Sequence, residues 1–183
     1  MNPKNVRDKY KEDEIYRAIG QFAVKFEHVV LSLLTGIRFL LHRGGLVSPN
    51  LANVMLAGLT AEQLKSILQA MIPEFVVLDQ RDERIVKEIF KKVVNIIEKR
   101  NDIIHRSWLV GWPGVKQTEF SKVHGSKFKR GKKGIEFKPV SYTVMDFDSL
   151  SAECDYAVML IDRLAICVQM ERKISTDVEL SKV

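Results

Sequence analysis

Apolar residues recur at steps of three and four along two long segments, and this spacing constrains the fold most. Between Glu12 and His42 the repeating residues are Ile15, Ile19, Phe22, Phe26, Val29, Leu33, Ile37 and Leu40. Between Asp79 and Ile104 they are Ile85, Ile89, Val93, Ile96, Ile97 and Ile103 or Ile104. Such steps place side chains on one face of an α-helix. The sequence therefore predicts two long helices, each of which buries one face.

Two shorter helical segments lie between these long ones. Ser48-Pro49 predicts a helix start, since proline is favoured in the first turn. Thr60 and Gln63 have the spacing of a capping box, which predicts a second start. This helix is expected to continue to about Met71 and to end at Pro73, because proline lacks the N–H that a helix interior needs.

A last helix is predicted from Asp146 or Asp148, either of which suits an N-cap, to about Lys173. Its apolar positions are Leu150, Cys154, Ala157, Met159, Leu160, Leu164 and Val168. The tail after Ser175 is expected to be frayed. If the two short pieces between residues 48 and 71 are counted as one interrupted segment, the chain has four helical segments. These pack most simply as an up-down bundle, so the fold class predicted is all-α.

The net charge of the chain comes from one stretch. The formal charge of the 183 residues is +6, and residues 116–138 hold eight basic and two acidic side chains, which accounts for all of it. Alternating patterns in residues 119–123 and 135–144 predict two strands around the Gly- and Lys-rich residues 125–134. The sequence thus predicts a β-hairpin with a long basic tip, inserted at about 116–144, and a Gly/Pro loop at 108–115.

The basic hairpin is a candidate nucleic-acid contact. Its phosphate-binding candidates are Lys127, Lys129, Arg130, Lys132 and Lys133, with Phe128 interleaved for base stacking. The alternative is a solvated tip whose lysines keep it soluble and protect an edge strand from pairing.

A polar cluster interrupts the second long apolar pattern near its end. Arg100 occupies a position where the pattern asks for an apolar residue, and an unpaired buried guanidinium is costly. It therefore either extends past the helix end or faces a pocket or interface. Asn101 and His105, four apart, share a helix face. Imidazole can give or take a proton near neutral pH, and guanidinium suits phosphate. These residues are candidates for phosphate chemistry.

The run Arg100-Asn101-Asp102-Ile103-Ile104-His105 resembles the signature of the HEPN superfamily (higher eukaryotes and prokaryotes nucleotide-binding). That signature is an Arg, often followed by Asn, Asp or His, and a His four to six residues on, near the end of the third helix of an all-α bundle. The resemblance implies a four-helix bundle that forms homodimers in which two motifs face each other. It also implies a metal-independent ribonuclease with Arg100 and His105 as catalytic residues and Asn101 assisting.

Other roles remain open beside RNA cleavage. Family members occur in toxin, antiviral-defence and RNA-processing systems, so an antitoxin or regulatory protein is a further expected partner. The alternatives are a non-catalytic nucleic-acid-binding or assembly module, with Arg100 and His105 hydrogen-bonded at a dimer interface, and a regulatory bundle that binds a nucleotide. Burial of both side chains among protein groups would favour the binding module, and an open cleft would favour the nuclease.

The residues after the motif have two interpretations each. Arg106 is a candidate second phosphate ligand, or a solvated cation at the helix end. Trp108 and Trp112 are expected to pack the loop onto the bundle, with base stacking as the alternative.

No cofactor, metal or membrane is expected. His28 and His42 lack ligand-spaced partners, and no nucleotide-binding loop or paired-cysteine motif occurs. No run of about 20 apolar residues is present to span a bilayer. Cys154 and Cys167 would lie about 20 Å apart on one helix, too far for a disulfide. Free thiols are typical of a cytoplasmic protein.

Overall fold

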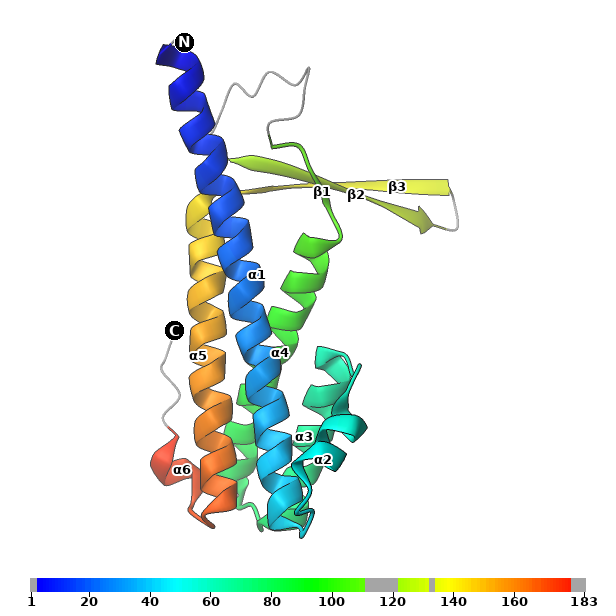
Figure 1. The fold of residues 1–183 in the computed structure, drawn as a ribbon, viewed down its shortest axis with the longest axis vertical. Coiled ribbons are helices and arrows are strands. Elements are labelled where there is room, and N and C mark those ends of the chain that lie inside the picture. The colour runs from blue at the N-terminus through cyan, green and yellow to red at the C-terminus, as the bar shows by residue number, and fades with distance from the viewer. Residues whose placement is uncertain (1–2, 111–121, 132–133, 179–183) are drawn as a thin grey trace. The chain divides into compact units, whose positions relative to one another are not determined.

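The computed structural model describes residues 3–110, 122–131 and 134–178, which are mainly helical with one small antiparallel sheet (Figure 1). In chain order the elements are α1 (Pro3–Arg43), α2 (Pro49–Leu56), α3 (Ala61–Phe75), α4 (Gln80–Ile104), β1 (Ser107–Trp108), β2 (Val123–Gly131), β3 (Gly134–Tyr142), α5 (Val144–Gln169) and α6 (Ile174–Asp177). The expectation of a predominantly helical fold is confirmed.

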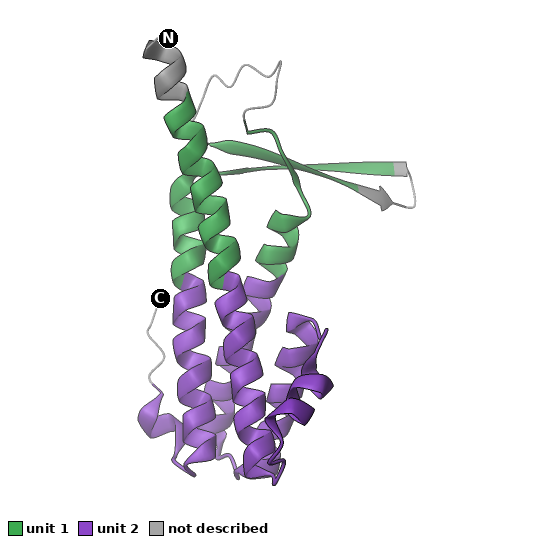
Figure 2. Cartoon of the chain, in the orientation of Figure 1, with its two compact units in different colours: residues 1–25, 98–152 green, residues 26–97, 153–183 purple. Residues whose placement is uncertain are grey.

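The chain forms two compact units, each assembled from two stretches of sequence (Figure 2). Unit 1 comprises residues 1–25 and 98–152, and unit 2 comprises residues 26–97 and 153–183. Helices α1, α4 and α5 therefore contribute residues to both units.

The predicted apolar stripes are the buried faces of α1 and α4. Along α1 every stripe residue is buried except Ile19, which is half-buried. Along α4 the buried stripe residues are Ile85, Ile89, Val93, Ile96, Ile97 and Ile103, whereas Ile104 is exposed. The helical spacing therefore identified the core positions of both helices correctly.

Unit 2 holds the larger apolar core. Helix α3 contributes Leu64, Leu68 and Ile72, and α5 contributes Cys154, Ala157, Leu160, Ile161, Leu164 and Val168. Gly36 of α1 permits a close approach, since a Cβ there would lie 3.3 Å from the Leu68 side chain. Cys154 and Cys167 are both buried on α5, as predicted, and neither forms a disulfide. Burial raises the pKa of the Cys167 thiol.

Several helix ends differ from the sequence prediction. Helix α1 begins at Pro3 rather than at about Glu12, and α5 ends at Gln169 rather than at about Lys173. Helix α3 contains Pro73 and ends at Phe75, with the Val76 N–H donating to the Ile72 carbonyl at 3.2 Å. Proline disrupts the hydrogen bond toward the preceding turn but does not prevent the residues after it from completing one. The predicted stop at Pro73 is therefore wrong by two residues.

The tail is ordered further than predicted. Helix α6 covers Ile174–Asp177, the Ser175 N–H donates to Asp82 Oδ1 at 2.8 Å, and Ile174 and Val178 are buried. The buried Asp82 carboxylate and two apolar anchors hold this segment in place. The prediction of a frayed tail is wrong through Val178, and residues 179–183 lie outside the described part.

Helix α5 is capped by Thr143 rather than by an aspartate. The Thr143 hydroxyl accepts from the Asp146 N–H at 3.1 Å, while the Asp146 carboxylate accepts from the Thr143 N–H at 2.7 Å. This is a reciprocal capping box in which Asp146 takes the third helical position. The predicted N-cap at Asp146 or Asp148 is corrected, because the helix begins at Val144.

The sheet has the order β1-β2-β3, with antiparallel neighbours. Strands β2 and β3 pair along nine residues each, from Val123 opposite Tyr142 to Gly131 opposite Gly134. The hairpin is confirmed, but the long basic tip is wrong, since residues 125–131 belong to β2. The prediction failed because it assigned these residues to a loop from their lysine and glycine content alone.

Strand β1 lies where a loop was expected. Ser107 and Trp108 pair with Ser126 and Gly125 of β2. Residues 111–121, which include most of the predicted loop and of the first predicted strand, lie outside the described part of the chain. None of the described helices combines the length and apolar character required to cross a bilayer.

Candidate functional site

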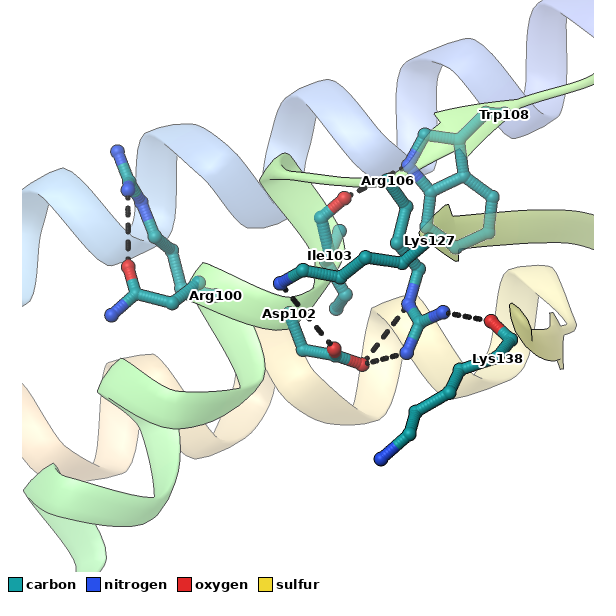
Figure 3. Close-up of polar contacts among 8 residues, drawn as sticks. Arg100, Asp102, Ile103, Arg106, Trp108, Lys127 and Lys138 are labelled. Carbon is teal, nitrogen blue, oxygen red and sulfur yellow. Dashed lines mark hydrogen bonds and ion pairs between the residues drawn. The ribbon is translucent and has the colours of Figure 1, made fainter. Parts of the chain in front are cut away.

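The predicted catalytic residues lie at the C-terminal end of α4, in unit 1. Ile103 is fully buried and anchors this end. Arg100 is half-buried, Asn101 is exposed, and exposed His105 is the first residue after the helix. Among the contacts of Arg100, its Nη1 donates to Asn101 Oδ1 at 3.2 Å (Figure 3). The structure therefore brings Arg100 and Asn101 together.

Exposure differs between the two predicted catalytic residues. His105 is exposed and Arg100 is half-buried, so the two side chains are not both buried among protein groups. Side chains with this exposure are compatible with a ligand site and equally with a dimer interface.

Arg106 is fixed inside the protein. Its Nε and Nη2 donate to Asp102 Oδ2 at 3.0 and 2.6 Å, and its Nη1 donates to the Lys138 carbonyl at 2.7 Å (Figure 3). Its side chain is only 5% exposed, so the expectation of a solvated cation is wrong. Strand β3 covers the guanidinium and supplies one of its acceptors.

Asp102 links the helix end to both long strands. Besides Arg106, its carboxylate faces Lys127 of β2, whose Nζ lies 4.0 Å from Oδ1. We call Asp102, Arg106, Lys127 and the Lys138 carbonyl the hairpin lock. Arg100 lies apart from this lock (Figure 3), although it belongs to the same helix end.

Trp108 contacts both the end of α4 and two aromatic residues of β3 and α5. Its Nε1 donates to the Ile103 carbonyl at 3.0 Å, which satisfies an acceptor at the helix end. Its ring makes edge-to-face contacts with Tyr142 and Phe147, with centroids 5.9 and 5.8 Å apart. The predicted packing role is confirmed for Trp108, whereas Trp112 lies outside the described residues.

The close packing of the Trp108 ring explains why residue 125 is a glycine. A Cβ at Gly125 would lie 2.7 Å from Cζ3 of Trp108 and 2.8 Å from Cε3. The ring therefore occupies the space above this backbone, and only glycine fits there.

The predicted phosphate ligands of the hairpin are described only in part. Lys127 belongs to the hairpin lock, and its side chain is 23% exposed. Lys129 and Arg130 lie in β2 opposite Glu136 and Ile135, but their side chains are outside what the structure describes, as are Lys132 and Lys133. Lys138 belongs to the basic stretch but was not among the predicted phosphate ligands. Its side chain is 54% exposed, and its Nζ lies 3.8 Å from Glu136 Oε2.

Two features of this region escaped the sequence prediction. Asp102 and Arg106 are four apart with opposite charges, a spacing that alone predicts an ion pair on a helix. Phe137 pairs with Phe128 across the strands. That pairing depends on the hairpin register, which the sequence did not reveal.

A polar cavity of about 500 Å³ lies in unit 2 and is lined by charged side chains that pair with protein groups. Arg43 donates there to the carbonyls of Val168 and Phe75 and to Glu171, and Lys173 pairs with Asp79 at 2.8 Å. The pair lowers the pKa of Asp79 and raises that of Lys173. These charges neutralise one another and tie chain segments together.

Within the described part of the chain, no three His, Cys, Asp or Glu side chains gather as metal ligands would. No family model, curated protein or solved structure gives a significant match to this chain.

Proposed function

We propose that this protein is an endoribonuclease that works without a metal ion, with its reacting groups at the C-terminal end of α4. The observation that carries the proposal is the contact between Arg100 and Asn101 near the end of α4, with exposed His105 directly after the last residue of that helix. The same unit contains the basic hairpin. A guanidinium, an amide and an imidazole are suited to phosphoryl chemistry at neutral pH.

The chemistry uses the ribose 2′-hydroxyl as nucleophile. Its oxygen attacks the adjacent phosphorus while the bond to the 5′ oxygen breaks, which leaves a 2′,3′-cyclic phosphate and a 5′-hydroxyl. His105 takes the proton of the 2′-hydroxyl or protonates the leaving 5′ oxygen. Arg100 stabilises the charge that develops on the phosphoryl oxygens, and Asn101 orients the phosphate or the imidazole.

A second copy of the chain completes this scheme. One imidazole cannot be both base and acid in the same step, so a homodimer would supply His105 from each protomer. In this proposal the chain is one HEPN-like four-helix domain with a hairpin insertion. Its proposed setting is a cytoplasmic toxin or defence system with an antitoxin or regulatory partner.

The test is cleavage of total RNA by the purified protein in excess EDTA. We expect products that end in 2′,3′-cyclic phosphate, and a loss of at least about 100-fold in rate for Arg100→Ala and for His105→Ala. Arg84→Ala, an exposed arginine on the same helix, and His28→Ala, an exposed histidine on α1, are matched controls. Activity that survives both motif substitutions contradicts the proposal.

The second candidate is a nucleic-acid-binding module without catalysis. The hairpin lock favours it, because a basic ribbon held at its base can bind RNA whether or not the motif reacts. RNA that is bound but not cut by the wild-type protein would select this alternative.

A further inference from the structure

An exposed aromatic pair lies on one face of the β2–β3 ribbon. Phe128 and Phe137 are directly opposite each other, and their ring centroids are 5.3 Å apart at an interplanar angle of 44°. Their side chains are nevertheless 69% and 57% exposed. Ile135, two positions from Phe137 and hence on the same face, is 76% exposed.

The opposite face of the ribbon is the one that packs within unit 1. Side chains alternate between the faces of a strand, so Gly125 and Lys127 face away from Phe128. Gly125 is covered by the Trp108 ring, and Lys127 faces Asp102. The packed face thus fixes the ribbon and leaves the rings of Phe128 and Phe137 available for a ligand.

The charge of the ribbon indicates which ligand suits these rings. Residues 123–142 contain six basic side chains and one acidic side chain, Glu136. Lys127 faces Asp102 on the packed face, so the excess positive charge attracts a ligand to the ribbon as a whole and not through lysines beside the rings. A ligand that complements the ribbon carries regularly spaced negative charge together with flat apolar groups. Single-stranded nucleic acid has both, since its phosphates attract lysine and arginine while its bases stack on aromatic rings.

We propose that Phe128 and Phe137 form a base-stacking platform for single-stranded RNA. The choice of RNA over DNA rests on the proposed ribonuclease function, while the platform rests on the exposed ring pair and its charge. Duplex RNA is a poor ligand, because its bases already stack on each other inside the helix.

The test measures binding separately from cleavage. The probe is a fluorescein-labelled 2′-O-methyl oligouridine of about 12 nucleotides, within the site sizes of single-strand binders. It lacks the 2′-hydroxyl nucleophile, so the full-length wild-type chain binds it without cutting it. The variant is Phe128→Leu with Phe137→Leu, which keeps apolar side chains but removes both rings. Phe39→Leu, at a phenylalanine of α1 that is 39% exposed, is the matched control.

We expect the double variant to bind about 10- to 100-fold more weakly and the control to stay within about twofold. The slope of affinity against salt should not change, since the rings carry no charge. Circular dichroism and thermal melting check that both proteins fold. Loss of affinity with preserved melting supports the platform.

Other outcomes overturn the platform. Unchanged affinity in the double variant does so, as does an equal loss of affinity for a duplex of the same sequence. Ring-dependent flotation with phosphatidylserine vesicles, without ring-dependent oligouridine binding, assigns the face to lipid instead. Cleavage by the wild-type protein with no effect of the rings on binding rejects the platform alone. Ring-dependent binding without cleavage rejects the ribonuclease alone.

Discussion

Two arginines six positions apart at the end of α4 have opposite environments. Arg106 is 5% exposed and donates to a carboxylate and a backbone carbonyl, with its planar group held in one orientation. Arg100 is half-buried, and one of its contacts is with Asn101, which is exposed to solvent. The comparison shows that two arginines of one short run can differ both in burial and in the kind of acceptor that they contact.

Stability measurements should separate these arginines by the largest margin. Arg106→Ala leaves the Lys138 carbonyl and the Asp102 carboxylate without their main donor, and we expect a loss of about 2–3 kcal/mol in the free energy of unfolding. Arg100→Ala should cost less, about 1 kcal/mol, because Arg100 is only half-buried and its contact Asn101 is exposed. Urea unfolding followed by circular dichroism measures both. Equal losses would show that Arg100 is as structural as Arg106.

The second prediction concerns the Trp108 ring, which packs on the backbone of Gly125 near Arg106. Gly125→Ala places a methyl group 2.7 Å from the indole ring, and we expect a loss of about 1–3 kcal/mol through overpacking. Gly20→Ala on α1 is the control, since nothing lies within 4 Å of the added carbon and alanine favours a helix. Thermal melting should therefore move in opposite directions for the two variants.

The capping box of α5 gives the smallest effect and depends on pH. The Thr143 N–H and hydroxyl hold the pKa of the Asp146 carboxyl below its ordinary value of 3.8. Because the pKa is lower in the folded state, the ionised carboxylate stabilises the fold at pH values above 3.8. This stabilisation is lost as the pH falls through the lower pKa of the folded state. Because Asp146 is exposed and screened by water, we expect Asp146→Asn to cost about 1 kcal/mol or less at neutral pH.

The melting-temperature difference between wild type and Asp146→Asn should shrink as the pH falls below about 4. Asp148→Asn, an exposed aspartate in the same helix, provides the matched comparison. A difference that stays constant down to about pH 2 would exclude the carboxylate as the source.

Helical periodicity predicted the fold well where burial controls the pattern. The stripes of α1 and α4 are buried almost as expected, and the Thr60–Gln63 capping box is present at the start of α3. The hairpin was harder to predict, because both faces of β2 are polar or aromatic and no alternation of apolar and polar residues marks the strand. Its strand length came from pairing with β3, which sequence composition does not encode.

The candidate site was predictable in its residue types but not in their environments. Arg100 and His105 were found from a break in the apolar pattern and from the spacing of the motif. The contrast between Arg100 and Arg106 arises from β3. The carbonyl of Lys138 in this strand accepts a hydrogen bond from Arg106, although Lys138 lies 32 positions later in the chain. Only the tertiary contact distinguishes the two arginines.

The division of three helices between the two units limits how this protein can be dissected. Unit 1 needs residues 1–25 as well as 98–152, and the intervening stretch belongs to unit 2. No contiguous fragment therefore contains one unit without part of the other, and a truncation at either end of the chain removes segments that a retained unit requires. Activities must instead be mapped by point substitutions in the intact chain.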